Sequence, residues 1–348
     1  MTYSMRPFEL HRPADVAEAV ALAGEYPGAK YLAGGTDLVV NLRRRIAEPD
    51  HVIALGAVDG LREVELEGDA LAIGSRVTIA ELAAHPEVMA RLPLLAEAAG
   101  QVAGPTIRGM ATLGGNLVLD TRCRYYNQSY FWRQANDFCL KKDGDVCHVA
   151  PGGTFCWAAF SADTPPVLLM LDAEVELVGP EGDRKLPLAD FYGPDGRWSI
   201  GTEPGGKRPG ELLTRVRIPF LEAGWEGVYE KLRVRDSIDY PLLGVGLMVR
   251  REGNGAGPRS LTGLRMALTA VNPRPERIDG LDELVGGELS AQVVDQLRRK
   301  ANRRGKPMRT AVADPAYRRA MIGALVERAA LRLAPELKAQ LASTQSLA

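Results

Sequence analysis

The sequence predicts an α+β fold divided between more than one packed unit, and two observations support this prediction. The chain has 348 residues, which exceeds the usual size of one domain, so two or three units with their own cores are expected. Segments with helical spacing alternate with short strand-like segments. Hydrophobic residues make up 46% and charged residues 25%, which is the balance of an ordinary folded protein.

The N-terminal third supplies the clearest alternation of helices and strands. Apolar residues at helical spacing predict a helix over 16–23, and a short strand is expected at 31–33. Further strands are predicted at 52–55 and 70–73. Residues 78–81 read Thr-Ile-Ala-Glu, the spacing of a capping box, so we expect a helix to begin there.

Regular structure resumes after an irregular central segment. Alternation with period two over 173–178 predicts a half-buried strand, and 212–219 predicts another. A linker-like stretch follows this second strand. We therefore expect one domain over 1–221 and a smaller one over 222–333.

The smaller domain is expected to combine strands and helices as well. Strands are predicted at 228–234 and 244–250. Ser290 and Asp314, which is followed by proline, are typical first residues of two helices. The last fifteen residues, 334–348, are expected to form a tail.

Charge and hydropathy exclude several classes of protein. The 43 lysines and arginines nearly equal the 44 aspartates and glutamates, so no overall field attracts nucleic acid or an anionic membrane. Residues 1–13 lack the apolar core of a signal peptide, and the longest apolar stretch, 167–171, ends at Asp172. We expect a cytoplasmic protein without a membrane span.

All four cysteines lie within one tenth of the chain, in an irregular, aromatic and glycine-rich segment. They are Cys123, Cys139, Cys147 and Cys156. In a reducing compartment such a group favours a metal or cluster site over two disulfides. The intervening gaps of fifteen, seven and eight residues contain no Cys-x-x-Cys, so spacing alone leaves iron–sulfur, zinc and unligated thiols open. His148 keeps a mixed cysteine and histidine zinc site among these alternatives.

A glycine pair follows the strand predicted at 31–33. Gly34 and Gly35 precede Thr36 and Asp37, and a helix is expected to begin at 38–42. Glycines allow main-chain N–H groups to approach a phosphate closely, which suits a diphosphate. The alternative is a tight turn in which Asp37 only caps the helix.

A second loop repeats the same chemistry. Thr112 is followed by Gly114, Gly115 and Asn116, so a hydroxyl, two glycines and a short amide recur together. An ordinary turn with a packing glycine is the alternative. Neither loop matches the Gly-x-Gly-x-x-Gly or Walker pattern, which argues against Rossmann and P-loop folds. Two such loops would be able to share one diphosphate.

Two further charged residues have a functional and a structural interpretation. Asp163 is able to accept hydrogen bonds from ribose or ribityl hydroxyls, or to cap the helix that begins after it. Lys231 lies in an alternating strand segment, where a solvated charge is the structural interpretation.

With these motifs in this order, the chain resembles the FAD-binding subunits of the molybdenum hydroxylase (xanthine dehydrogenase) family. The resemblance implies a two-part FAD-binding domain, a smaller C-terminal α+β domain and FAD as cofactor. Val102 matches a position at which some members of this family have an aromatic ring that stacks on the flavin, and valine is not able to stack in this way. The implied FAD-binding residues are Lys30, Tyr31, Leu32, Ala33, Gly34, Gly35, Thr36, Asp37, Thr112, Gly114, Gly115, Asn116, Asp163 and Lys231.

Residues 120–161 form an insertion that most of the family lacks. The runs at 120–128, 139–144 and 146–148 resemble the β subunits of the 4-hydroxybenzoyl-CoA reductase branch. That resemblance implies a 4Fe-4S cluster with one ligand each from Cys123, Cys139, Cys147 and Cys156.

The same resemblance implies an electron-transfer role without a catalytic residue of its own. An external donor such as ferredoxin would reduce the cluster, and FAD would pass electrons to two 2Fe-2S clusters on a small subunit. A large molybdopterin-binding subunit would then remove the phenolic hydroxyl of 4-hydroxybenzoyl-CoA, in a dimer of heterotrimers. Two alternatives stay open: a hydroxylating molybdenum dehydrogenase acting on another aromatic or purine substrate, and a zinc-stapled scaffold without enzyme activity.

Overall fold

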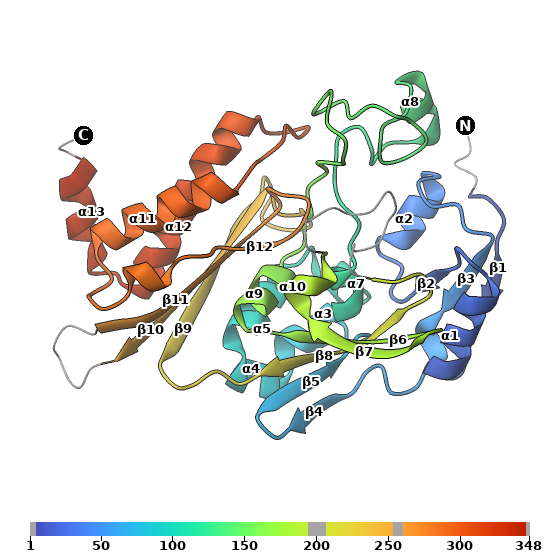
Figure 1. Ribbon diagram of the computed structural model, residues 1–348, viewed down its shortest axis with the longest axis horizontal. Helices are drawn as coiled ribbons and strands as arrows, with labels where there is room; N and C mark the ends of the chain where they lie inside the picture. The colour runs from blue at the N-terminus through green and yellow to red at the C-terminus, as the bar shows by residue number, and fades with distance from the viewer. Residues whose placement is uncertain (1–4, 194–206, 253–259, 346–348) are drawn as a thin grey trace.

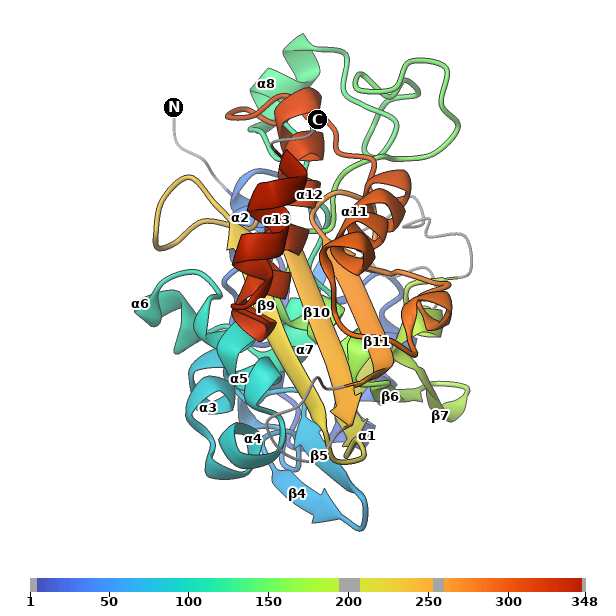
Figure 2. The same ribbon diagram turned by 90° about the vertical axis from the view of Figure 1, so that its left-hand side faces the viewer.

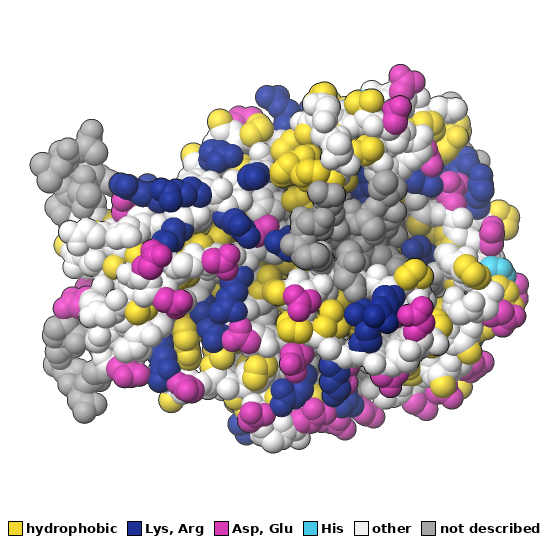
Figure 3. All heavy atoms as spheres, in the orientation of Figure 1, with side chains coloured by type: hydrophobic (Ala, Val, Ile, Leu, Met, Phe, Trp, Pro, Cys, Tyr) yellow, Lys and Arg dark blue, Asp and Glu magenta, His cyan; other side chains and the backbone are white. Residues whose placement is uncertain are grey.

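The computed structural model describes residues 5–193, 207–252 and 260–345, arranged around three β-sheets (Figure 1). The predicted α+β class is confirmed. None of the helices in these ranges is both long and apolar enough to cross a bilayer. Positive and negative side chains are interspersed over the face shown in Figure 3.

The first sheet is parallel and carries the N-terminal glycine loop. Its strands, in the order β1-β3-β2, are β1 (Glu9–His11), β3 (His51–Ala54) and β2 (Lys30–Leu32). Helix α1 (Val16–Glu25) buries Ala19 and Val20 against it. Strand β2 runs into the first glycine pair, and α2 (Leu38–Arg43) follows that pair. A one-turn 3-10 helix covers Leu55–Ala57.

The second sheet is antiparallel and has helices packed on it. Its order is β4-β5-β8-β6-β7, with β4 (Val64–Glu67), β5 (Ala70–Gly74), β8 (Leu212–Pro219), β6 (Glu174–Gly179) and β7 (Gly182–Pro187). The associated helices are α3 (Ile79–Ala84), α4 (Pro86–Arg91), α5 (Pro93–Gly100), α6 (Pro105–Arg108), α7 (Leu113–Leu117), α9 (Thr164–Met170) and α10 (Leu188–Phe191). The predicted capping box is confirmed, because Thr78 and Glu81 hydrogen-bond reciprocally at the start of α3.

The third sheet forms the C-terminal unit. Its order is β12-β11-β10-β9, with β12 (Glu276–Arg277), β11 (Ser260–Thr269), β10 (Leu243–Glu252) and β9 (Trp225–Leu232). Figure 2 shows one face covered by α11 (Ala291–Arg304), α12 (Pro315–Leu333) and α13 (Leu337–Gln345). Ser290 and Asp314 cap α11 and α12, as predicted. A second 3-10 helix covers Asp282–Leu284.

The C-terminal residues correct one expectation. Residues 334–348 were expected to form a tail, but α13 occupies 337–345. Leu337 is fully buried and Leu341 nearly so, and both belong to the core of the third sheet. Their spacing of four residues places them on one face of the helix, which packing stabilises despite the short polar sequence around them.

The cysteine-containing insertion projects from the body beside the first sheet (Figure 1). Within the described ranges, its one helix is α8 (Tyr130–Ala135), and the rest consists of turns and loops. Tyr126 and Cys139 pack with Ile46, which follows α2, in a small apolar cluster. The insertion is therefore attached to the segment that follows the first glycine loop.

Candidate functional site

The two glycine loops lie directly against each other. A Cβ added at Gly34 would stand 1.7 Å from the carbonyl oxygen of Met110, which leads into the second loop. Gly35 has a φ of 73°, in the left-handed region that favours glycine. Both glycines of the first loop are thus required by backbone geometry.

The first loop offers unpaired main-chain donors. Within the ranges that the structure describes, the N–H groups of Gly34, Gly35 and Thr36 make no hydrogen bond to a protein acceptor. Asp37 does not cap α2 with its side chain, contrary to the structural interpretation. Its carboxylate instead accepts a hydrogen bond from Arg122, and one of 3.2 Å from Asn41. The loop therefore presents N–H groups for an anion.

The second loop differs from the first in its main-chain hydrogen bonds. The Gly114 N–H donates to the Ser75 carbonyl at 2.8 Å, and the Gly115 N–H donates to the Thr112 hydroxyl at 3.1 Å. A Cβ on Gly114 would lie 2.8 Å from the Ser75 Cβ. These glycines thus permit close packing, and their amides are already engaged within the protein.

Both loops line one cavity of about 380 Å³, which we call the glycine-loop cavity. This volume lies in the range of cofactor and ligand pockets. Of the residues expected to bind FAD, all but Leu32 and Lys231 line it: Lys30, Tyr31, Ala33, Gly34, Gly35, Thr36, Asp37, Thr112, Gly114, Gly115, Asn116 and Asp163. Val102 also lines this cavity, at the position where some relatives are expected to have an aromatic ring.

A buried ion pair holds Asp163, which lines the cavity. The Asp163 carboxylate accepts hydrogen bonds from the Lys231 ammonium at 2.9 Å and the Tyr229 hydroxyl at 2.8 Å. Lys231 also donates to the Gln101 carbonyl at 2.8 Å. The interpretation of Lys231 as a solvated charge is wrong, because its side chain is 1% exposed. Asp163 does not cap α9 with its side chain either.

Burial dominates the protonation behaviour of this group. It raises the pKa of Asp163, while the neighbouring Lys231 ammonium acts in the opposite direction. The pKa of Tyr229 is raised well above its ordinary value by burial and by the adjacent carboxylate. The tyrosine therefore stays a hydrogen-bond donor to Asp163 and holds the carboxylate in one orientation.

Sequence reasoning missed the wall that the C-terminal unit contributes. Ile238, Asp239 and Tyr240, in the loop between β9 and β10, line the glycine-loop cavity. The Arg122 guanidinium donates to the Tyr240 hydroxyl at 2.8 Å and lies 4.5 Å from the centre of its ring. No local signal marks these residues, because their position depends on how the third sheet packs against the rest of the chain.

The four cysteines converge on one second cavity, which we call the cysteine cavity. Its lining includes Cys123, Cys139, Cys147 and Cys156, with Tyr125, Tyr126, Lys141 and His148 among the other residues. All four are free thiols. Burial raises the pKa of Cys123 to about 11 and also raises the pKa of Cys156. The expectation that these distant positions share one site is thus supported by their arrangement.

The separation of the thiols is informative. Within the described chain, no three of the four sulfurs lie within 4.8 Å of one another. Four sulfurs around one tetrahedral zinc ion would stand about 3.8 Å apart, given a Zn–S distance of about 2.3 Å. A cluster spreads its cysteine ligands farther, because each sulfur binds a different iron. The four thiols thus share one cavity without forming a preassembled tetrahedral zinc site in the described chain.

A buried ion pair joins the two cavities. Asp120 lines the glycine-loop cavity, whereas Lys141 lines the cysteine cavity, and the two side chains form an ion pair that is almost fully buried. Tyr126 donates a 2.7 Å hydrogen bond to Asp120, and its ring lies 4.5 Å from the Lys141 ammonium. The two sites therefore share a wall of charged and aromatic side chains.

Two family models match the chain and together cover most of it. Residues 6–221 match the FAD binding domain in molybdopterin dehydrogenase. Residues 228–333 match the CO dehydrogenase flavoprotein C-terminal domain. These matches agree with the two parts expected from the sequence.

Individual relatives point the same way. The chain is 31% identical over 324 residues to the carbon monoxide dehydrogenase medium chain of Hydrogenophaga pseudoflava, covering 92% of this chain and 95% of that protein. It is 34% identical over 286 residues to the aldehyde oxidoreductase FAD-binding subunit PaoB of Escherichia coli K12, covering 80% and 86%. The structure of carbon monoxide dehydrogenase from Hydrogenophaga pseudoflava superposes with a TM-score of 0.74 at 28% identity, covering 94% and 96%. This chain therefore belongs to the FAD-binding subunits of the molybdenum hydroxylase family.

Proposed function

We propose that this chain is an electron-transfer subunit that carries a 4Fe-4S cluster in addition to FAD. The observation that carries the proposal is the convergence of Cys123, Cys139, Cys147 and Cys156 on one cavity. Four thiolates complete the ligation of such a cluster. Tyr125, Tyr126 and Leu140 line the same cavity and limit access of water.

The residues of the glycine-loop cavity suit FAD. The free N–H groups of the first loop, residues 34–36, would hold the diphosphate, and Asp163 would accept hydrogen bonds from the ribityl or ribose hydroxyls. Lys231 acts through Asp163, which it fixes in place, because its own side chain does not line the cavity. When bound, flavin supplies one- and two-electron transfer.

The shared wall supports a relay between the two centres. Asp120 contacts the glycine-loop cavity and Lys141 contacts the cysteine cavity, so their ion pair spans the space between them. Arg122 adjoins Cys123 in the sequence and bonds to both Asp37 and Tyr240 on the other side. Electrons passing between cluster and flavin would have a short, protein-filled path.

The remaining centres belong to partners. The four cysteines of this chain are too few for two 2Fe-2S clusters as well, which require eight ligands. We propose a small subunit with two 2Fe-2S clusters and a large molybdopterin-binding subunit as partners, in a dimer of heterotrimers. The name "medium chain" of the carbon monoxide dehydrogenase relatives supports such a multisubunit arrangement.

The direction of electron flow has two candidates. The resemblance of the insertion to 4-hydroxybenzoyl-CoA reductase favours inward flow from a donor such as ferredoxin. The relatives, named as carbon monoxide dehydrogenase, aldehyde oxidoreductase and nicotine 6-hydroxylase, favour the alternative in which a substrate is oxidised and electrons leave through the flavin subunit.

Anaerobic purification of the native complex tests the cofactor assignment. Iron, acid-labile sulfide, zinc and FAD are measured for the wild type, Cys147→Ser and His148→Gln. In the wild type we expect four irons and four sulfides beyond those of the 2Fe-2S centres. The content of this additional iron and sulfide should be lower in Cys147→Ser and unchanged in His148→Gln. Stoichiometric zinc without the additional sulfide would overturn the cluster, and absence of FAD would overturn the relay.

The direction is tested on the same complex. Reduced ferredoxin with 4-hydroxybenzoyl-CoA is compared with an aromatic aldehyde or purine substrate and an oxidised dye. Formation of benzoyl-CoA supports the reductive direction, and dye reduction without benzoyl-CoA supports the alternative. Because this experiment uses substrates, its outcome is independent of the metal analysis.

A further inference from the structure

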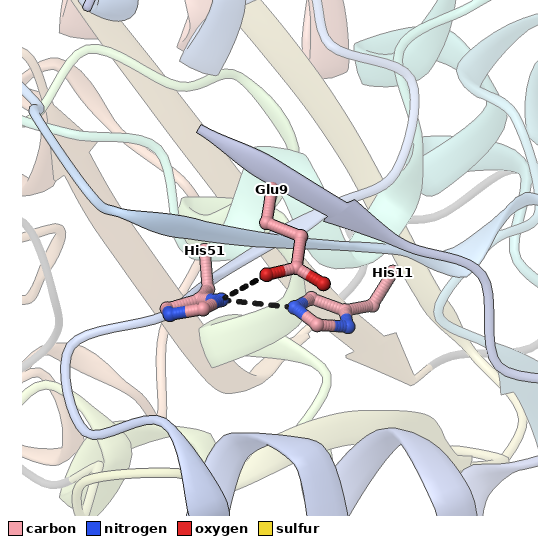
Figure 4. Close-up of side chains that lie close together, drawn as sticks. All are labelled: Glu9, His11 and His51. Carbon is pink, nitrogen blue, oxygen red and sulfur yellow. Dashed lines mark hydrogen bonds and ion pairs between the residues drawn. The ribbon is translucent and has the colours of Figure 1, made fainter. Parts of the chain in front are cut away.

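A group of metal-ligating side chains lies on the first sheet, outside both cavities. Glu9 and His11 are two residues apart on β1, so their side chains point to the same face of the sheet. The neighbouring strand β3 begins with His51, which is paired in register with Glu9. Figure 4 shows the three side chains directed toward one another.

Their distances approach those of metal ligands, and the two imidazoles are hydrogen-bonded to each other. The His11 Nε2 and His51 Nδ1 atoms are 3.0 Å apart, and the Glu9 Oε2 atom lies 3.7 Å from His51 Nδ1. All three ligand atoms fall within 4.8 Å of one another. Ligands around a tetrahedral zinc ion stand about 3.3 to 3.5 Å apart, given Zn–N and Zn–O distances near 2.0 to 2.2 Å. The exposed Glu9 side chain would move its carboxylate to complete the site.

The two imidazoles are held in place by a third ring. The Tyr26 ring stacks on His51 with centroids 3.9 Å apart and on His11 at 4.9 Å, with interplanar angles of 20° and 22°. This stacking restricts both imidazole rings in the absence of an ion. The loss of side-chain freedom on binding is therefore small, which favours affinity.

The accessibility of the group suits an exchangeable ion. His11 and His51 are partly buried, whereas Glu9 is exposed with 66% of its side chain accessible. An ion would thus have two fixed nitrogen ligands, one adjustable carboxylate and an open side for water. Imidazole nitrogen selects zinc and its transition-metal neighbours over magnesium and calcium, which prefer oxygen ligands.

We propose that Glu9, His11 and His51 form a binding site for a divalent transition-metal ion of the zinc type, with water completing the coordination. The ion joins β1 to β3, the central strand of the first sheet. Strand β3 also pairs with β2, which leads into the first glycine loop. The site is structural, and it shares no residue with the glycine-loop or cysteine cavity.

A crystal of the full chain soaked in zinc chloride tests the proposal by position. We expect an anomalous difference peak at the zinc edge between His11 Nε2, His51 Nδ1 and the Glu9 carboxylate, about 2.0 to 2.2 Å from each. The cysteine cavity is able to bind zinc as well, so the location of the peak is what decides. Zinc only at the cysteines would overturn the proposal.

Calorimetry in solution supplies the second readout. Zinc binding is compared between the wild-type full chain, with its cysteine site occupied, and the variants His11→Gln, His51→Gln and Glu9→Gln. The matched control is His85→Gln, which changes a histidine outside the group. Each histidine variant should bind one equivalent of zinc fewer than the wild type, or bind zinc at least tenfold more weakly. The control should keep the stoichiometry and the affinity of the wild type. Equal binding by all variants would contradict the proposal, and unchanged thermal unfolding without zinc verifies that each variant folds.

Discussion

The glycine-loop cavity and the cysteine cavity adjoin each other but are built by different means. In the first, backbone contacts between regular elements set the shape, as where Gly34 meets the Met110 carbonyl. In the second, an irregular insertion is held by side chains, chiefly the buried pair of Lys141 and Asp120. Arg133 adds a 2.7 Å hydrogen bond from α8 to the carbonyl of Arg45.

The difference has a thermodynamic meaning. Backbone packing between sheets is formed by the whole fold, so the glycine-loop cavity exists before any ligand binds. The cysteine segment buries little apolar surface of its own, and Phe131, Trp132 and Val146 remain exposed. Metal ligation is therefore expected to contribute much of its stability, as in other small ligand-stapled segments. Four substitutions test this contrast, from the largest expected effect to the smallest.

Gly34→Ala should have the largest effect. The new Cβ would collide with the Met110 carbonyl, so both loops must separate, at a cost of about 4 kcal/mol or more. FAD should be lost from the purified chain, as measured by visible absorbance and flavin analysis. Gly100→Ala is the control, because nothing lies within 4 Å of its added Cβ. FAD retention by Gly34→Ala at wild-type stability would contradict the backbone origin of this cavity.

Lys231→Met should destabilise the protein by about 3 kcal/mol, because it leaves Asp163 buried without its cation. The loss should depend on pH. A carboxyl whose pKa is raised on folding binds more protons in the folded state than in the unfolded state. The variant should therefore lose stability as the pH rises from about 4, the ordinary pKa of an aspartate, toward the raised pKa of the folded-state Asp163. Urea unfolding of both proteins at several pH values measures this. A penalty of the same size at pH 3 and pH 7 would show that lost packing is responsible.

Asp120→Asn should act on both cavities at once, since it removes the carboxylate that pairs with the Lys141 ammonium near the thiols. We expect a destabilisation of about 2 kcal/mol and lower iron content together with weaker FAD retention. Asp145→Asn is the matched control, an acid-to-amide change in the same insertion at an exposed position. Loss of iron without any change in FAD affinity would mean that the shared wall does not couple the sites.

Phe131→Ala should have the smallest effect. This ring is 63% exposed, so its removal should change the free energy of unfolding by no more than about 0.5 kcal/mol, with iron content unchanged. Tyr126→Phe is the contrasting change, since it removes the buried hydroxyl that donates to Asp120 and should cost about 1 kcal/mol. Chemical unfolding of the two variants in parallel provides the measurement.

Local patterns predicted much of the fold. The strand at Leu212–Pro219, the capping box at Thr78 and the helix starts at Ser290 and Asp314 all depend on neighbouring residues, and the structure contains each of them. Both glycine pairs also line the glycine-loop cavity. Such features are set by hydrogen bonds and periodicity within a few positions.

Features fixed by distant contacts escaped prediction. Lys231 appears in the sequence as one of several alternating charges, and only the packing of β9 against α5 encloses it with Asp163. Tyr240 reaches the cavity from another domain, and α13 is held by apolar contacts that its mixed sequence does not reveal. In each case tertiary burial overrides the local pattern.

The contacts of Arg122 have a consequence for folding kinetics. This side chain bonds to Asp37, 85 residues earlier, and to Tyr240, 118 residues later. Contacts between such distant positions require closure of long chain loops, which slows folding. The Arg122 junction should therefore form only after both the first sheet and the β9–β10 hairpin are in place. During synthesis, the flavin pocket would stay incomplete until the C-terminal unit has emerged from the ribosome.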